Sequence, residues 1–430
     1  MEIGLQSHRS SYKKSIALPH VNKHRVVVTG LGVVAPNGIG IDEFWGSLIT
    51  GKSGIGPITL FNAAGFRSQI AGEVKNFHLS KYVDGEFKSK RMARHTQLAL
   101  AATQLALSDS QYNCSECRGP LPVYLGISSS AFDLIEKGMR QLQEKGPQFV
   151  THHVVRSSPP QTATCMVSEM IKTQGADSQA FTFSTSCAAG LDAIAAATES
   201  IRSGKTDVAI AGGVDSEITP TAFATFIAAG LACTQNQYPE RASRPFDLGR
   251  ETGVISEGAG VVILESLDHA RARNAKIYLE VTGYGTFVDS EEPGSGLFES
   301  MQQALSNAGK NPQHIRYVCA HGAGHPVLDR TETMMIKKLF GLHAYKVPVS
   351  SIKGVIGNPL AAAGPLQVIT CALAFKHNLI PPTANYEKPD PTCDLDYVPN
   401  NARMSHFSSA LINAHGIGGG NSSLVVEKVV

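Results

Sequence analysis

The chain has 430 residues, of which 42% are hydrophobic, so it is long enough for two or three domains around a large core. A formal net charge of +2 without a long basic run argues against a nucleic-acid-binding protein. No stretch is apolar and long enough to cross a membrane. Eight cysteines without regular spacing argue against a disulfide framework and favour a reducing compartment, the cytoplasm.

The N-terminal residues 1–23 contain basic residues and serines but no apolar run of signal-peptide length, and we expect a flexible tail there. An organellar transit peptide is the alternative for this segment. Further along, Cys114 and Cys117 form a single Cys-x-x-Cys pair without a second pair, which is a weak signal for zinc. No metal site is therefore predicted.

Two distant stretches share one pattern, a strand followed by Val-Thr-Gly-x-Gly, at residues 24–38 and 276–285. This repetition predicts an internal duplication with halves at residues 24–268 and 269–430. Both halves alternate strands with helices, which we expect at residues 41–49, 95–108, 191–202, 297–308 and 364–376. Such alternation predicts parallel-type sheets covered by helices, with the active site at strand ends.

The stretch from Gln179 to Ser203 places a reactive residue at a turn. Residues 180–185 form a short predicted buried strand, and the Ala-rich segment from Leu191 onward has helical periodicity. Cys187 therefore lies at a strand-to-helix turn, where free backbone N–H groups and the helix dipole favour a nucleophilic thiolate. The same N–H groups can bind the oxyanion formed when a thioester is attacked. The alternative is a buried, inert cysteine.

Three turns in the second half carry histidine, lysine or clustered glycines. They span residues 320–332, 349–364 and 411–423. The first contains His321 and the second contains Lys353, each shortly after a predicted strand. A histidine beside glycine at a strand end is by itself more often structural. Three such turns, together with a cysteine at a helix start, predict a shared active site.

Several motifs occur in a fixed order along the chain. They are Val26–Gly32, Ser186–Gly190, Ala211–Asp215, Ala242–Asp247, Ser256–Gly260, Ala320–Gly322, Ser350–Lys353 and Ile380–Asn385. In this order and at these separations they resemble a β-ketoacyl-carrier-protein synthase of the elongating type, within the thiolase-like superfamily. The resemblance covers residues 24–430 and implies an α/β protein with a duplicated thiolase-like fold, layered α-β-α-β-α.

In that family a cysteine takes an acyl chain from a carrier protein as a thioester. Two histidines then assist decarboxylation of a malonyl thioester, whose enolate attacks the acyl group. By the resemblance Cys187 is the nucleophile, His321 is the first histidine and Lys353 is the active-site lysine. Asp329 and Glu332 match the acidic pair that supports the first histidine motif.

Asn358 stands where the family has its second histidine. An Asn side chain donates hydrogen bonds to an enolate oxygen, but it cannot serve as acid or base near neutral pH. Related chain-initiating ketosynthases use Cys, His and Asn together. The resemblance is therefore compatible with decarboxylation, with His321 and Asn358 as the two hydrogen-bond donors to the enolate.

Other residues of the pocket and its gate depart from the family pattern and predict an altered substrate. Ala323 and His325 stand where the family has two threonines that hold the phosphopantetheine arm, and His415 and Ile417 replace two aromatic rings. The resemblance implies an oxyanion hole made of the backbone N–H groups of Cys187 and His415. The His415 side chain is either a pocket filler or the imidazole missing from the site, and His325 has the same two interpretations.

Three further departures lie nearby. The pair Thr252-Gly253 stands where the family has Gly-Phe, which removes a third aromatic ring, and Gln367 replaces a glutamate. The loop at residues 286–294 is shorter than in the family. All three changes again favour an altered substrate.

The family's partner is an acyl carrier protein, an acidic helical protein that docks on basic residues beside the site entrance. Lys88, Lys90, Arg91 and Arg94 occupy the matching position, with an ordinary solvated helix start as the alternative. Substrates arrive on the phosphopantetheine of the carrier, and no other cofactor is implied. Family members are dimers, so we expect a homodimer, with a heterodimer with another ketosynthase-like chain as the alternative.

The sequence leaves three functional hypotheses. The favoured one is a carrier-dependent ketosynthase of polyketide or fatty-acid-type biosynthesis, which forms a C–C bond by decarboxylative Claisen condensation. The second is a non-elongating acyltransferase or cyclase that passes the Cys187 acyl group to another nucleophile. The third is a non-catalytic partner subunit, against which the retained Cys187, His321 and Lys353 argue.

Overall fold

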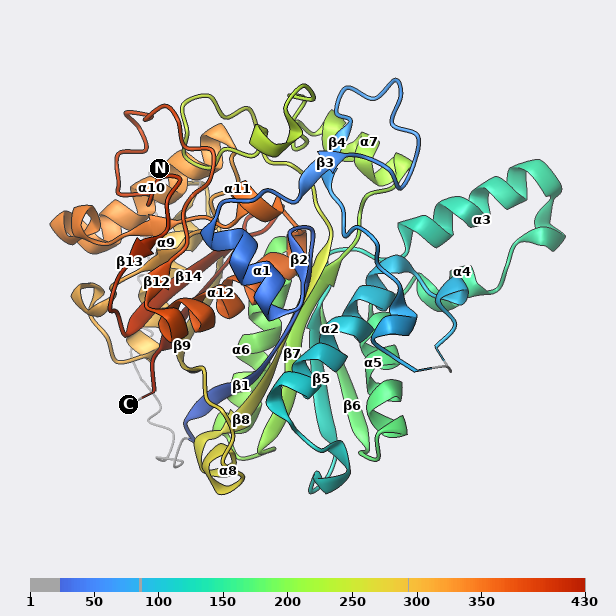
Figure 1. The fold of residues 1–430 in the computed structure, drawn as a ribbon, viewed down its shortest axis with the longest axis horizontal. Helices are drawn as coiled ribbons and strands as arrows, with labels where there is room; N and C mark the ends of the chain where they lie inside the picture. Colours follow the sequence, from blue (N-terminus) through green and yellow to red (C-terminus); the bar gives the residue numbers. More distant parts are fainter. Residues whose placement is uncertain (1–23, 85–86, 293, 430) are drawn as a thin grey trace, which may run out of the picture.

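The computed structural model describes residues 24–84, 87–292 and 294–429. The predicted tail at residues 1–23 lies outside the described residues. In the described part of the chain, one mixed sheet of eleven strands runs through the molecule (Figure 1). Two strand pairs lie outside it, β3 (Ile55–Pro57) with β4 (Ile70–Gly72) and β12 (Leu379–Ile380) with β13 (Arg403–Met404).

The large sheet consists of two runs of strands, one from each half of the sequence. The first run is, in spatial order, β1 (Val26–Ala35), β8 (Gly258–Ser266), β7 (Val208–Asp215), β5 (Leu121–Gly126) and β6 (Ser178–Phe183), with β2 (Gly38–Ile39) beside β1. The second run is β9 (Leu279–Val288), β15 (Gly420–Glu427), β14 (Ser409–His415), β10 (Val318–Cys319) and β11 (Val349–Ser350). A short antiparallel pairing of β1 with β9 joins the two runs.

The two runs have the same connectivity. In each, the first strand pairs antiparallel with the last, and the last pairs antiparallel with the fourth. The fourth then pairs parallel with the second, which pairs parallel with the third. Identical strand order and identical pairing sense confirm the predicted duplicated fold.

Helices form three layers around the two runs of strands (Figure 1). The helices α2 (Arg94–Ser110) and α5 (Gln161–Thr173) cover one outer face, and α9 (Ser295–Asn307) and α10 (Pro326–Phe340) cover the other. Between the runs lie α6 (Ala189–Arg202) and α12 (Ala363–His377). Every residue of α12 from Ala363 to Phe375 is buried, which is the pattern of a helix packed on all sides. The layer order is therefore α-β-α-β-α.

The remaining helices lie at the edges of these layers. They are α1 (Ile41–Ile49), α3 (Phe132–Lys145), α4 (His153–Ser157), α7 (Pro220–Ala228), α8 (Leu267–Ala272) and α11 (Lys353–Ile356). Figure 1 shows α3 and α4 projecting from the body of the molecule on the right. No helix of the described residues is long and apolar enough to cross a membrane.

Two expectations about strands were wrong. The sheets are mixed rather than parallel, because β14 and β15 are joined by a short turn, which leaves them antiparallel. The strand before the cysteine is not buried: β6 is the last strand of its run, and Phe181 is 41% exposed. An edge strand lacks a neighbour on one side, so part of its surface stays open in a single chain.

Candidate active site

Cys187 lies in the 3₁₀ turn η5 (Ser186–Ala188) between the end of β6 and the start of α6. The turn is sharp because Ser186 has a φ of 55°, in the left-handed region that residues other than glycine rarely adopt. The helix that follows packs directly on the second half of the chain. A Cβ at Gly190 would lie 2.2 Å from the backbone oxygen of Ala361, so only glycine fits there.

A cavity of about 240 Å³ has Cys187 in its wall. Its remaining wall is partly apolar, and its polar lining residues are Thr252, His321, His325, Asn358 and His415. The structure therefore brings together side chains that the sequence placed in separate turns. The fourth predicted catalytic residue, Lys353, is 1% exposed and lies behind His321 rather than in the cavity wall.

The Cys187 thiol is buried, with 2% of the residue exposed. Burial raises the pKa of the thiol above its usual value, while the charge of Lys353 and hydrogen bonds from Ser186 and the backbone of Ile417 lower it. The helix start therefore does not produce the low thiol pKa that the turn predicts. Because the thiol form dominates near neutral pH, the cysteine needs a partner that takes its proton.

The predicted oxyanion hole needs a correction at its second residue. The backbone N–H of His415 donates to His321 Nδ1 at 3.1 Å, so it is not available for an oxyanion. The backbone N–H of Ile417 interacts with the Cys187 sulfur instead. The reason is local: β14 ends at His415, and the chain reaches the nucleophile turn only after Gly416, which packs closely against that turn.

His321 follows β10 and is 3% exposed. Its Nδ1 accepts the His415 N–H and lies 3.0 Å from Lys353 Nζ. A backbone N–H is always a donor, so Nδ1 holds the lone pair and the neutral ring carries its proton on Nε2. Burial, and then the charge of Lys353, lowers the pKa of His321 well below its usual value. The ring is therefore a neutral hydrogen-bond donor in the cavity wall.

The acidic pair on α10 holds the His321 loop by its backbone. Glu332 accepts the N–H of His321 at 2.9 Å and the N–H of Gly322 at 2.8 Å. Asp329 accepts the N–H of Gly324 at 3.1 Å, and burial raises its pKa to about 7. Burial likewise raises the pKa of Glu332. Both carboxyl groups position the loop without touching the cavity.

Lys353 is the first residue of α11, and its ammonium group donates to His321 O at 2.7 Å. Burial lowers the pKa of Lys353 to about 8, while the nearby Cys187, Glu332 and Asp329 oppose that shift. The lysine thus fixes the orientation of His321 and places a positive charge near the thiol.

Asn358 is held by its main chain. Its N–H donates to Val254 O at 2.7 Å, and its carbonyl oxygen accepts the Ser256 N–H at 3.1 Å. The side-chain oxygen is buried without a hydrogen-bond donor among the described residues. A buried carbonyl oxygen that has no donor in the protein is suited to accept a hydrogen bond from a substrate.

Two of the departures from the family pattern have a structural role. The Nδ1 atom of His325 accepts the N–H groups of Val327 and Leu328, so this histidine caps the start of α10. The amide of Gln367 donates to the carbonyl oxygens of Cys319, Ala320 and Asn413 and ties α12 to the strands behind His321. Ala323 and Thr252 line the cavity, and the Thr252 hydroxyl oxygen has no partner among the described residues.

The sequence did not indicate the surroundings of the His415 side chain. Its Nδ1 lies 2.6 Å from Asn421 Oδ1, and Asn421 Nδ2 donates to Asp289 Oδ1 at 2.8 Å. Asn421 belongs to the glycine-rich third turn, and Asp289 lies in the loop whose shortening was noted. No spacing in one sequence could pair them, because they are brought together only when β15 aligns with β9.

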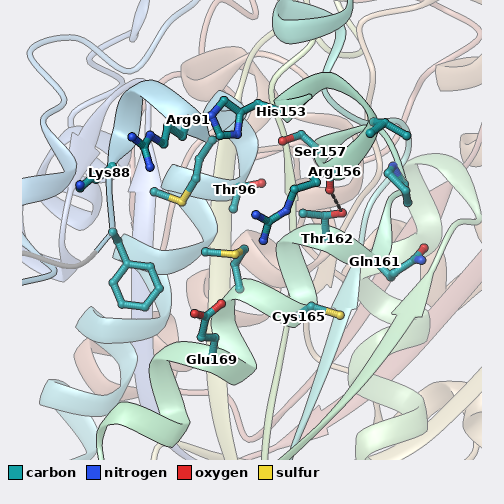
Figure 2. A pocket seen from close by; sticks show the side chains of 15 residues that line it. Lys88, Arg91, Thr96, His153, Arg156, Ser157, Gln161, Thr162, Cys165 and Glu169 are labelled. Atoms are coloured by element: carbon teal, nitrogen blue, oxygen red, sulfur yellow. Dashed lines mark hydrogen bonds between the residues drawn. The ribbon is translucent and has the colours of Figure 1, made fainter. Parts of the chain in front are cut away.

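Two of the four predicted carrier-docking residues line a surface pocket of about 750 Å³ (Figure 2). Lys88 and Arg91 are exposed and line it, and Arg156 and His153 add two further basic side chains. Lys90 is exposed beside them.

Arg94 has a different role from the predicted one. Its guanidinium donates to Glu257 Oε2 and Oε1 at 2.7 Å each and to Val74 O at 2.9 Å. Glu257 is completely buried, so this ion pair is part of the protein interior. Arg94 is therefore removed from the docking set.

No group of three or more His, Cys, Asp or Glu residues in the described ranges is arranged to hold a metal ion. Cys114 is buried, and burial raises its pKa to about 11. Neither cysteine of the Cys-x-x-Cys pair forms a disulfide in the structure.

Comparison with known proteins gives consistent matches over the chain. Residues 23–270 match the family described as Beta-ketoacyl synthase, N-terminal domain, and residues 272–387 match Beta-ketoacyl synthase, C-terminal domain. The 3-oxoacyl-[acyl-carrier-protein] synthase 2 of Coxiella burnetii is 38% identical over 417 residues, covering 95% of this chain and 100% of that protein. The tetracenomycin polyketide synthase ketoacyl synthase alpha subunit of Streptomyces glaucescens is 38% identical over 423 residues, covering 95% and 98%.

One solved structure contains a chain that matches this protein with a TM-score of 0.87. That structure is of a type II polyketide synthase acyl-carrier protein in complex with its ketosynthase, bound to the hexaketide. That chain is 32% identical, and the match covers 95% of this protein and all of the other. The duplicated fold, the shared cavity and the two family matches agree with one another. The protein belongs to the β-ketoacyl synthase family.

Proposed function

We propose that the protein is a carrier-dependent ketosynthase of polyketide or fatty-acid-type biosynthesis, a condensing enzyme that works by decarboxylative Claisen condensation with Cys187, His321 and Asn358. In the first half-reaction the Cys187 sulfur attacks the acyl thioester on a carrier, and the carrier thiol leaves. In the second, a malonyl thioester loses CO2, and the resulting enolate carbon attacks the acyl group on Cys187. The second half-reaction forms a C–C bond and releases the cysteine.

One observation supports this proposal most directly, the fixed tautomer of His321. Its Nδ1 is occupied by the N–H of His415, so its Nε2–H can only donate. Decarboxylation places negative charge on the thioester oxygen, and two donors at that oxygen stabilise the enolate without acid or base chemistry. Asn358 also lines the cavity, and the NH2 group of its amide supplies the second donor. The pair does the work that two histidines do in the family pattern.

The oxyanion of the acyl transfer steps is assigned to different groups. The backbone N–H of Ile417 interacts with the Cys187 sulfur, and the N–H of Cys187 lies in the same turn. Both are backbone donors fixed before any substrate binds, which is the arrangement that stabilises a tetrahedral intermediate at little cost.

For the partner, we propose an acidic acyl carrier protein that docks at the basic pocket of Lys88, Arg91 and Arg156, with Lys90 beside it (Figure 2). Figure 2 shows Lys88 and Arg91 on one side of Arg156, which faces them across the hollow. Charge complementarity of this kind speeds encounter and weakens as salt rises. The related ketosynthase structure, which was solved with its acyl-carrier protein, supports a partner of the same class.

We also propose that two chains associate through β6. This strand ends the first run of the sheet, and Gln179, Ala180 and Phe181 are exposed along it. An open edge with an exposed aromatic residue suits pairing with a second copy. A homodimer is the simpler assembly, and the alpha-subunit name of the Streptomyces glaucescens relative makes a heterodimer the alternative. Sedimentation of the purified protein distinguishes a dimer from a monomer.

The test of function uses intact mass spectrometry. The purified protein is mixed with an acyl-loaded carrier and then with a malonyl carrier, and the masses of all three proteins are followed. We expect an acyl adduct that is absent in Cys187→Ala, followed by loss of CO2 and an extended β-ketoacyl carrier. Acylation without extension, with carriers that a conventional ketosynthase extends, would replace condensation by simple acyl transfer.

A further inference from the structure

Three imidazoles line the cavity, and their hydrogen bonds divide them into two kinds. Backbone N–H groups occupy Nδ1 of His321 and of His325, so each of these neutral rings carries its proton on Nε2. Neither ring therefore offers a basic nitrogen to the cavity. His415 has the opposite arrangement.

The orientation of the Asn421 amide fixes the tautomer of His415. Asn421 Nδ2 donates to Asp289 Oδ1 at 2.8 Å and to Gly419 O at 2.9 Å, and both of these atoms only accept. Its oxygen must then face His415 Nδ1, which lies 2.6 Å away and has to be the donor. The lone pair of the neutral ring is therefore on Nε2. In the described part of the chain, no group is hydrogen-bonded to that atom.

Acylation of the cysteine requires a proton acceptor. The thiol is buried and mostly protonated near neutral pH, and it must lose its proton as the C–S bond forms. His321 has no free lone pair, Asn358 is not basic, and Lys353 donates in both of its contacts with His321. Among the polar groups of the described cavity wall, only one ring nitrogen remains that can accept a proton.

We propose, building on the condensation proposed above, that His415 is a further catalytic residue, which accepts the proton of Cys187 during acylation and returns it to the leaving carrier thiol. No hydrogen bond joins the His415 ring to the thiol in the free protein, so the transfer runs through a water molecule in the cavity. The sulfur bonds to the acyl carbon as its proton passes to His415 Nε2. The carrier C–S bond then breaks, and the imidazolium protonates the departing thiolate.

Asn421 and Asp289, which lie behind His415, suit the role of His415 as a proton acceptor. Once protonated, His415 carries a positive charge, and the chain through Asn421 ends on the carboxylate of Asp289. The other titratable groups near the ring are His321, whose ring centre is 6.0 Å away, and Cys187, with Lys353 behind them.

On the helix side, Asp192 accepts from Ser422, the β15 neighbour of Asn421. His325 lines the same cavity, with Arg250 near it. These groups complete the titratable and charged surroundings of the ring.

The test compares single-turnover acylation of Cys187 in the unchanged protein and in two variants. His415→Phe removes the ring nitrogens, and His415→Gln keeps a donor for Asn421 but supplies no basic nitrogen. We expect both variants to acylate about 10²- to 10⁴-fold more slowly near neutral pH, because general base catalysis contributes on that order. The deficit should shrink as the pH rises, since the thiolate then forms without help.

His377→Phe serves as the matched control, because His377 is exposed and stacks on Trp45 far from the cavity wall. It should acylate at the rate of the unchanged protein. Alkylation of Cys187 by iodoacetamide at alkaline pH should be the same in all variants, because it needs no base. Equal acylation rates and equal pH profiles in His415→Phe and the unchanged protein would overturn the proposal.

A loss of acylation accompanied by an equal loss of alkylation at alkaline pH would also overturn it, because the histidine would then be structural. The experiment distinguishes failure of the His415 proposal from failure of the proposed ketosynthase function. If the unchanged protein is not acylated at all, the ketosynthase proposal fails first, and this one with it. If it is acylated and the variants match it, only the role of His415 fails.

Discussion

Replacement of Glu332 by Gln tests how the His321 loop is held. The carboxylate is 3% exposed and accepts three donors, the N–H groups of His321 and Gly322 and the amide of Asn413 at 3.1 Å. The glutamine oxygen keeps two of these bonds without the charge, which weakens each by about 1 kcal/mol. Its NH2 group faces the third donor, and an unsatisfied buried N–H costs about 1–3 kcal/mol.

Part of that loss is offset, because burial of the Glu332 charge is itself unfavourable and raises the pKa of its carboxyl group. The net expectation for Glu332→Gln is about 2–4 kcal/mol of lost stability, together with slower extension because the His321 donor is no longer held.

Differential scanning calorimetry and the carrier extension assay measure the two effects. Glu299→Gln is the matched control, because Glu299 is exposed on α9 and should melt like the unchanged protein. If Glu332→Gln melts and extends like the unchanged protein, the carboxylate does not hold the loop, and the derivation from these three hydrogen bonds is wrong.

Three other outcomes follow from the same structure. Alkylation of Cys187 should be slow near neutral pH and increase steadily with pH, because burial raises the pKa of the thiol; a plateau below pH of about 8 would contradict this. Lys353→Met should raise the thiol pKa further, since the lysine charge lowers it, and should slow alkylation at about pH 8, whereas the surface change Lys346→Met should not. Arg94→Ala should lower the free energy of unfolding by about 3–5 kcal/mol, because it leaves the Glu257 carboxylate buried and unpaired. Lys90→Ala should leave the melting temperature unchanged and weaken carrier binding.

Local patterns were enough to predict the turn of Cys187 and the five helices that the sequence analysis named. The helix at residues 41–49 has the predicted bounds, and the Ala-rich segment after the cysteine forms α6. These elements depend on neighbours in the sequence, which a single chain displays directly. The repeated Val-Thr-Gly-x-Gly pattern likewise predicted the duplication. Its two copies lie in β1 and β9, which are the equivalent first strands of the two runs.

Contacts between residues far apart in the chain could not be predicted in the same way. The second donor of the oxyanion hole is the N–H of either His415 or Ile417, and these two residues belong to one short motif. Which of them it is depends on how the glycine turn between them packs against Cys187. The ion pair of Arg94 with Glu257 joins residues 163 positions apart, so the basic segment looked like a surface patch. Burial of the Cys187 thiol by the second half raises its pKa, whereas the helix dipole lowers it. The sequence of the turn alone does not show that burial.

His415 influences the site through two different parts of the residue. Its backbone N–H fixes His321 as a donor, and its side chain is fixed by Asn421 as an acceptor. A substitution of the side chain removes only the second effect. His415→Phe should therefore leave decarboxylation of a malonyl carrier near its normal rate while acylation of Cys187 is slowed, because the His321 and Asn358 donors remain in place. Measured CO2 release that falls in parallel with acylation would show that the two functions of this residue are not separable.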